Sequence, residues 1–143
     1  MRKNKLLILF FVAVLLFGQI FFSSCTTSAN EITVRLTIRA GEEELLDDYI
    51  SLSYPDPTVL MLISEASMLY EINVVYNDNN DSVKDIEEYK DKTDGNLMYF
   101  WEYTINGVLP ENTTGGKANA QPIKDGDEIV YMYSVIDTTT VKK

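Results

Sequence analysis

The sequence predicts an α+β fold, in which one helix packs on a mixed β-sheet of about four to six strands. Segments with an apolar residue at every second position occur near the start and near the end of the chain, and this period is typical of strands with one buried face. A segment with the three-to-four-residue period of a helix lies between them. A turn-forming pair, Asn106-Gly107, follows the longest alternating segment. A helix that covers one face of a sheet buries the apolar residues of the helix and those of the strands together.

The first two strands are predicted near residue 32 and near residue 50. The segment "EITVRLTIRA" alternates cleanly between apolar and polar residues. We expect the acidic "EEELLDD" that follows Ala40-Gly41 to form a long connection, after which "YISLSY" alternates again. The two segments predict an opening antiparallel hairpin. Its buried side chains are expected to be Ile32, Val34, Leu36, Ile38, Ile50, Leu52 and Tyr54.

A helix is predicted over "PDPTVLMLISEASMLY", where the period changes. Asp56 before Pro57 fits an N-cap followed by proline at the first helical position. The residues expected to face the sheet follow the spacing of a helix that is buried on one side: Val59, Leu62, Ile63, Ala66 and Tyr70.

The next segments predict a strand and then a polar stretch. The β-branched "EINVVYN" is typical of a strand. The acidic "DNNDSVKDIEEYKDKTDG" contains only isolated apolar residues, at Val83, Ile86 and Tyr89. We therefore predict no long element between residues 78 and 95.

The last two strands are predicted from "LMYFWEYTI" and "DEIVYMYSV". Asn106-Gly107 supplies the positive φ angles of a turn after the first of them. The segment "LPENTTGGKANAQ" is expected to be a mobile loop, and residues 138–143 a frayed tail. In the longest strand, one side holds Leu97, Tyr99, Trp101, Tyr103 and Ile105, and the other holds Met98, Phe100, Glu102 and Thr104.

Residues 1–24 have the layout of a secretory signal, with a basic start, an apolar run over 6–22 and small residues at the end. The segment "FFSSC" resembles the lipobox of bacterial lipoproteins, which implies that Cys25 is lipidated and that residues 25–31 form a short tether. An uncleaved anchor helix and an accidental cysteine are the alternatives. The resemblance implies a chain held at the extracytoplasmic face of a bacterial cell membrane.

Composition restricts the partners of the exported part. Loss of residues 1–24 leaves 119 residues, enough for one domain, and removes three of the 12 basic side chains but none of the 22 acidic ones. The resulting net charge of −13 argues against nucleic acid and anionic lipid as ligands, because both bind through Lys and Arg. All nine Tyr and the single Trp lie in this part, and such polar-tipped rings suit both sheet packing and contact surfaces.

Three segments together resemble a known domain: "TVLMLISEAS" on the helix, "YFWEYTING" on the longest strand and "IKDGDEIVYMY" on the closing strand. They are similar to the β-grasp domain of many bacterial surface proteins, a family related to the C-terminal domain of the vitamin B12 carrier transcobalamin. The resemblance implies a β-grasp-like domain over residues 32–137. In the transcobalamin relatives this domain covers one face of a corrinoid, and a larger helical domain holds the other. That helical half has no counterpart in this sequence, so the resemblance implies partial burial of a cobalamin-like ligand.

The candidate ligand-binding residues lie on and just after the longest strand. Base rates for alternating strands favour Trp101 and Tyr103 in the core, which leaves the side of Phe100 and the nearby loops as the contact surface. The candidates are Tyr99, Phe100, Trp101, Tyr103 and Asn106.

Two further motifs and the case for catalysis are weak. Asn77, Asn79, Asp81, Val83, Asp85 and Glu88 have the spacing of a calcium loop, but Ser82 replaces its required glycine. The segment "ENTT" matches a glycosylation acceptor, although a bacterial lipobox favours a plain loop. The chain has no His and its only Cys is expected to be acylated, so no common catalytic triad can form.

The sequence thus predicts a lipid-anchored binding module that is not an enzyme. Its ligand is expected to be a corrinoid or another small molecule. The alternative is a cell-surface protein-interaction or adhesion module without a small ligand. A concave aromatic patch favours the first, and a flat, unpaired strand edge favours the second.

Overall fold

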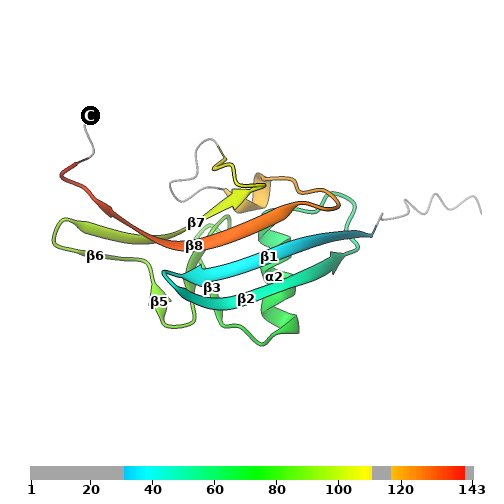
Figure 1. Cartoon of the computed structure of the whole chain (residues 1–143), viewed down its shortest axis with the longest axis horizontal. Helices are drawn as coiled ribbons and strands as arrows, with labels where there is room; N and C mark the ends of the chain where they lie inside the picture. The colour runs from blue at the N-terminus through cyan, green and yellow to red at the C-terminus, as the bar shows by residue number, and fades with distance from the viewer. Residues whose placement is uncertain (1–30, 111–116, 141–143) are drawn as a thin grey trace, which may run out of the picture.

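The computed structural model describes residues 31–110 and 117–140 (Figure 1). It confirms the α+β class, with one α-helix on a mixed sheet. In chain order the elements are β1 (Ile32–Ala40), β2 (Glu43–Leu52), α2 (Val59–Leu69), β3 (Val74–Tyr76), β4 (Val83–Ile86), β5 (Tyr89–Lys90), β6 (Lys92–Asp94), β7 (Leu97–Ile105), the 3₁₀ helix η2 (Ala118–Ala120) and β8 (Glu128–Asp137).

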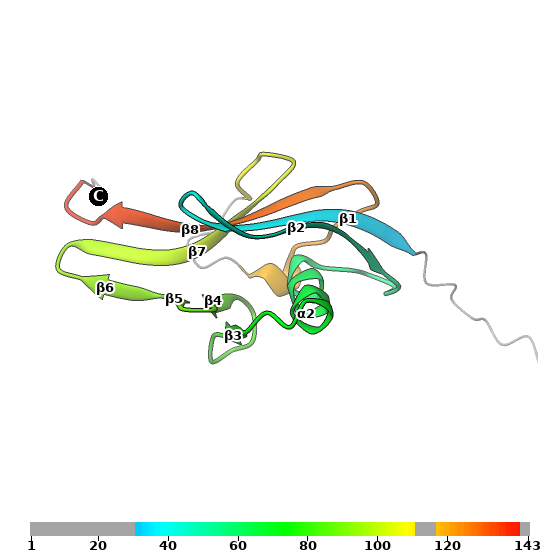
Figure 2. The same cartoon turned by 60° about the horizontal axis from the view of Figure 1, so that its bottom comes forward.

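The strands form a main sheet of five strands, in the order β2-β1-β8-β7-β6, and a smaller sheet in the order β3-β4-β5. Strands β1 and β8 pair in parallel at the centre, and every other pairing is antiparallel. Helix α2 and the smaller sheet lie on the same side of the main sheet (Figure 2). No described helix covers its other face.

The core lies between the main sheet, α2 and the smaller sheet, and alternation places most of the predicted residues in it. Tyr54, which was predicted to be buried, follows the end of β2 and is 38% exposed. The predicted side chains of β1 from Val34 to Ile38 are buried, as are Ile50 and Leu52 of β2. The helix contributes Val59, Leu62, Ile63 and Ala66, all at most 1% exposed. Tyr70, expected to face the sheet, is instead the C-cap residue of α2 and is 39% exposed.

The predicted long acidic connection after β1 is wrong, because those residues belong to β2. Ala40 pairs with Glu43, so Gly41 and Glu42 alone form the turn, and Gly41 adopts a positive φ of 65°. The acidic side chains of this half of β2 are exposed, while Leu45 and Leu46 are half-buried. Strand β2 is at the edge of the sheet, so solvent reaches it on two sides. An acidic segment can therefore pair as a strand here without strict alternation of apolar and polar residues.

The helix begins later than predicted. Thr58, not Asp56, is the N-cap, and its side-chain oxygen accepts a hydrogen bond from the Met61 N–H at 3.4 Å. Pro57 precedes the cap instead of opening the helix. Its carbonyl accepts a hydrogen bond from the Ile123 N–H at 3.0 Å, which ties the segment before α2 to the approach to β8.

The polar stretch after β3 contains more structure than its composition indicates. Its apolar points Val83 and Ile86 are buried and sit on β4, and Tyr89 begins the two-residue β5. These short strands close the core against Trp101, whose indole Nε1–H donates to the Tyr89 carbonyl at 2.9 Å. The predicted strands β7 and β8 are confirmed, in register from Leu97↔Asp137 to Ile105↔Ile129.

Candidate functional site

Strand β7 carries most of the candidate residues, but it does not bring them together. Trp101 and Tyr103, each 4% exposed, face the core under α2 and the smaller sheet. Phe100 is also buried, on the other side of the strand, and lies outside that core cluster. Tyr99 and Asn106 lie about 23 Å apart at opposite ends, from a rise of about 3.3 Å per residue. The candidates therefore divide between two separate surfaces and the core.

At the β6 end, four aromatic rings form a cluster. The Tyr133 ring packs against Trp101 with centroids 5.3 Å apart, and stacks on Tyr99 at 6.0 Å. Tyr89 meets Trp101 edge-on at 6.4 Å. The Tyr133 hydroxyl donates to the Lys90 carbonyl at 2.5 Å, and the Tyr89 hydroxyl donates to the Glu43 carboxylate. The hydroxyls of Tyr89 and Tyr133 are thus engaged within the protein, which indicates a structural role for these two rings.

A small hollow of about 260 Å³ lies beside this cluster. Lys92 Nζ lies 4.9 Å from the centroid of the Tyr99 ring, within the range of a cation–π contact. Asp91 Oδ1 accepts a hydrogen bond from the Trp101 backbone N–H at 3.3 Å. Desolvation is the main cause that raises the pKa of Asp91, to about 6, with a smaller contribution from Asp85. The hollow is lined by Asp91, Lys92, Thr93, Met98, Tyr99 and Phe100.

The raised pKa of Asp91 makes a prediction for stability against pH. Because the folded state holds this proton more tightly than the unfolded state, the ionised carboxylate lowers stability as pH rises from about 4 to about 6. Asp91→Asn keeps a side-chain oxygen for the Trp101 N–H and removes the charge. We expect it to raise the free energy of unfolding by about 1 kcal/mol at pH 7 and by little at pH 4, a value reduced for partial exposure.

Urea unfolding followed by Trp101 fluorescence at both pH values measures this difference. Asp94→Asn, on the exposed strand β6, is the matched control, because it also removes one carboxylate, and it is expected to leave the free energy of unfolding unchanged at pH 7. Equal stability of wild type and Asp91→Asn at pH 7 would contradict the prediction.

At the other end of β7, Asn106 holds the turn that follows the strand. Asn106 and Gly107 have φ angles of 51° and 76°, as the central residues of a type I′ turn require, and the flanking Ile105 and Val108 exchange backbone hydrogen bonds. The Asn106 side chain donates to Asp127 Oδ1 at 2.9 Å and accepts from the Glu128 N–H at 2.9 Å. Both ends of its carboxamide are therefore bonded within the protein. Asn106 positions the turn rather than offering a free group to a ligand.

This turn borders a larger hollow of about 370 Å³. Val108, which lines it, is 67% exposed, and the adjacent Leu109 is 50% exposed. Lys124 supplies a cationic group at the rim, and Asp127 an anionic one. The surface thus combines apolar side chains with a few polar groups, as small-molecule sites do. Its lining residues are Ile105, Asn106, Val108, Pro110, Gln121, Pro122, Lys124 and Asp127.

The sequence analysis expected the loops near the longest strand to form a contact surface, but it did not select Val108 and Leu109, because they follow the alternating strand and carry no pattern of their own. The available signal was two apolar residues directly after a tight Asn-Gly turn, a place where most chains put polar residues. Only the structure shows that the turn directs both side chains away from the core and leaves them exposed.

A third hollow, of about 360 Å³, lies between α2 and the β3–β4 connection. Leu60, Met61 and Tyr76 supply its apolar lining, and Asn80 and Asn119 supply amides. The Tyr76 hydroxyl is buried and has no hydrogen-bond partner among the described residues. This hollow contains none of the candidate residues.

The residues with calcium-loop spacing are divided between a turn and a strand: Asn77, Asn79 and Asp81 lie between β3 and β4, Val83 and Asp85 lie on β4, and Glu88 follows it. The Asn77 side-chain oxygen accepts the Asp81 N–H at 3.0 Å, and its amide donates to Asp81 Oδ1 at 2.6 Å. Two of the residues with calcium-loop spacing thus hydrogen-bond to each other. Within residues 31–110 and 117–140, no group of three or more acidic, His or Cys side chains is placed to hold a metal ion.

The predicted signal, Cys25 and the predicted tether up to residue 30 lie outside the described residues, as does the whole "ENTT" segment. In the described part of the chain, no helix is long and apolar enough to cross a membrane.

No protein-family model matches this sequence, and no curated protein matches it. Its fold matches that of solved structures. Haptocorrin, in a crystal structure of its complex with Cbi, superposes with a TM-score of 0.58 and 12% sequence identity, over 74% of this chain and 25% of the haptocorrin chain. A candidate metal-binding protein from Ruminococcus gnavus gives a TM-score of 0.47 and 16% identity, over 72% and 96% of the two chains.

This chain therefore spans about a quarter of the length of the haptocorrin chain that it matches. The resemblance to the transcobalamin type of domain is confirmed for the fold.

Proposed function

We propose that this protein is a small-ligand-binding module whose ligand is a corrinoid. The hollow beside the Asn106-Gly107 turn carries the proposal, because it combines exposed apolar side chains with a rigid, hydrogen-bonded wall. The fold shared with part of haptocorrin, which was crystallised with Cbi, supports a corrinoid as the ligand class. The proposed role is binding rather than catalysis.

The size of the hollow sets the mode of binding. Pockets that enclose a drug-sized ligand measure about 300–1,000 Å³, and this hollow lies at the lower end at about 370 Å³. A corrinoid is larger than such a ligand, so one edge or face of it would be covered and the rest would stay exposed. We therefore expect micromolar rather than nanomolar affinity for the isolated chain.

The proposed location is the extracytoplasmic face of a bacterial membrane, with acyl chains on Cys25 as the anchor. Acyl chains on one residue hold a small domain at the lipid surface without any spanning helix. The segment between Cys25 and β1 is short, which would keep the hollow close to the membrane and near any partner that receives the ligand.

Val108→Ser tests the hollow directly. The change removes apolar contact area from an exposed residue, so we expect it to weaken cobinamide binding about three- to ten-fold without loss of stability. Residues 26–143, which contain every described element, are titrated with cobinamide and with cobalamin. Binding is followed by calorimetry and by quenching of Trp101, the single tryptophan. Trp101 lies about 16 Å along β7 from Asn106, close enough for energy transfer to a corrin ring.

Val135→Ser is the matched control, because Val135 is 53% exposed but lies at the far end of β8, opposite Tyr99. It is expected to bind cobinamide as the wild type does. Equal weakening by both substitutions would place the ligand elsewhere, and an absence of saturable binding by wild type would overturn the corrinoid proposal.

A further inference from the structure

Strand β2 forms one of the two edges of the main sheet and is ten residues long. Figure 1 shows this strand along one border of the sheet. Its neighbour in the sheet is β1, and in the described chain no backbone hydrogen bond joins β2 to any other segment. Edge strands expose unpaired N–H and C=O groups to which another strand can add.

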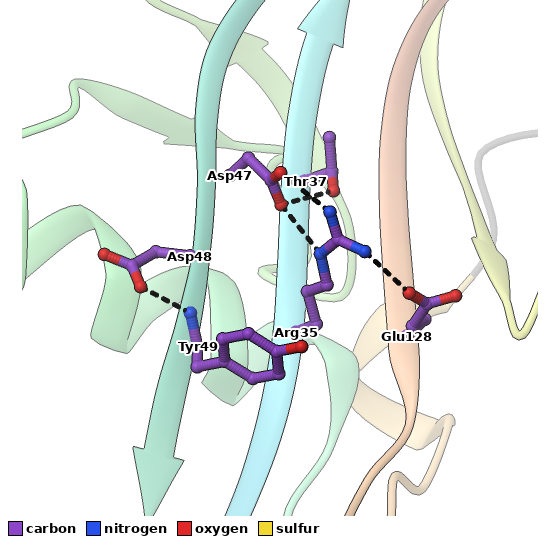
Figure 3. A network of polar contacts seen from close by, with 6 residues as sticks. All are labelled: Arg35, Thr37, Asp47, Asp48, Tyr49 and Glu128. Carbon is purple, nitrogen blue, oxygen red and sulfur yellow. Dashed lines mark hydrogen bonds and ion pairs between the residues drawn. The ribbon is translucent and has the colours of Figure 1, made fainter.

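The hydrogen bond of Tyr49 shows which backbone groups point outward. Its N–H donates to Asp48 Oδ1 at 2.7 Å, and is therefore turned away from β1 (Figure 3). In an antiparallel ladder, residues alternate between bonding to the neighbour and facing away from it. Asp47, Tyr49 and Ser51 thus direct their N–H and C=O groups toward the free edge. They stand opposite Thr37, Arg35 and Thr33, respectively.

The edge of β2 is long for a free edge, and its pairing with β1 is regular from Leu46 to Leu52. Natural sheets shorten their edge strands or interrupt them with proline or bulges, and the opposite edge, β6, has three residues. The single irregularity in the pairing of β2 with β1 lies opposite Ile38/Arg39. The strand contains no proline. The Asp48 carboxylate covers the Tyr49 N–H, and its other oxygen accepts from the Tyr70 hydroxyl at 2.7 Å.

The negative charge of β2 favours a basic strand as the partner that pairs with its free edge. Glu44 and Asp48 are exposed, and β2 contains no basic residue. Asp47 is already compensated, because Arg35 donates to both of its oxygens at 3.0 and 2.8 Å and also contacts Glu128 at 2.9 Å (Figure 3). A second copy pairing through β2 would bring acidic strands together, and like charges across a ladder are destabilising.

We propose that the edge of β2 is a docking site for an extended, lysine- or arginine-bearing segment of another protein, which adds to the main sheet as one further strand. Backbone hydrogen bonds to Asp47, Tyr49 and Ser51 supply the pairing. A cation of the partner takes over the Asp48 carboxylate, which releases the Tyr49 N–H for the new ladder. The exposed Tyr49 ring, 67% accessible, offers apolar contact to the partner's side chains. Strands β1 and β8 separate this edge from β7 and its hollow, so the inference does not depend on the corrinoid proposal.

The test is a titration of ¹⁵N-labelled residues 26–143 with a short peptide of alternating lysine and valine. We expect shifts concentrated at Asp47, Tyr49 and Ser51, and binding at least about ten-fold weaker for the same peptide with glutamate in place of lysine. Ser51→Pro removes an outward N–H without breaking the ladder to β1, and is expected to abolish binding. Ser51→Thr keeps that donor and is expected to bind as the wild type does.

An N-methylated lysine–valine peptide repeats the test from the partner's side, should Ser51→Pro fail to fold, and is expected to lose binding as well. Equal affinity for the lysine and glutamate peptides, shifts outside β2, or undiminished binding of the methylated peptide would overturn the proposal. Peptide-free dimerisation with shifts at the same amides would overturn it too, because the occupant would then be a second copy of this chain.

Discussion

Trp101→Ala is expected to lower the free energy of unfolding by about 3–5 kcal/mol, the range for large aromatic side chains in a core. Trp101 is 4% exposed and contacts both Tyr89 and Tyr133. Its indole N–H also donates to the Tyr89 carbonyl at 2.9 Å, which links the main sheet to the smaller one. The substitution therefore removes packing and a link between sheets at the same position.

Two variants separate these contributions. Trp101→Phe keeps most of the packing but leaves the Tyr89 carbonyl without its donor, so an intermediate loss is expected. Phe100→Ala removes the adjacent ring, which lies on the other face and outside the core cluster, and should cost less than Trp101→Ala. Urea unfolding followed by circular dichroism measures all three without relying on tryptophan fluorescence. Equal losses for Trp101→Ala and Phe100→Ala would show that the link between the sheets has no special weight.

Cys25→Ser is expected to abolish the incorporation of a fatty acid into this protein. A thiol accepts the lipid in the reaction implied by the lipobox resemblance, and serine offers no thiol. Each acyl methylene adds about 0.8 kcal/mol of membrane affinity, so the loss of whole chains removes the anchor. Growth of the expressing bacterium with an alkyne-tagged fatty acid, followed by mass measurement of the purified chain, reports both acylation and cleavage.

Ser24→Ala is the control, because it keeps a small residue before the cysteine and should leave labelling unchanged. Wild-type protein that carries no label and retains residues 1–24 would instead indicate an uncleaved anchor helix.

The period of the sequence predicted the main elements because packing in this domain follows alternation closely. Val34, Leu36, Ile129 and Tyr131 all fall on the buried side that their spacing indicates. Alternation failed in the first half of β2, where the strand is an edge and its side chains Glu43 and Glu44 remain in water. The first half of β2 is a strand because it pairs with β1. Such pairing involves two segments, so the pattern of one segment alone does not predict it.

The candidate site was harder to predict, because residues that are close together along a strand do not necessarily line the same surface. Tyr99 lies on β7 and Asn106 directly follows that strand, but the two border different hollows. Trp101 and Tyr103 between them are buried. The hollow beside Asn106 also uses Gln121 and Lys124, which the chain brings back only through the turn before β8. Such a surface depends on tertiary contacts that no local spacing encodes.

The parallel pairing of β1 with β8 has a consequence for how this protein folds. The two strands at the centre of the sheet are the first and last to be synthesised, and the Arg35–Glu128 contact joins positions 93 residues apart. Contacts of such long sequence separation slow folding, because the intervening chain must be ordered before they form. The β1–β2 hairpin can form early, but the central strand pair must wait for the final residues. The central pairing of this sheet therefore forms only after β8 has been synthesised, so folding of the whole domain is completed late.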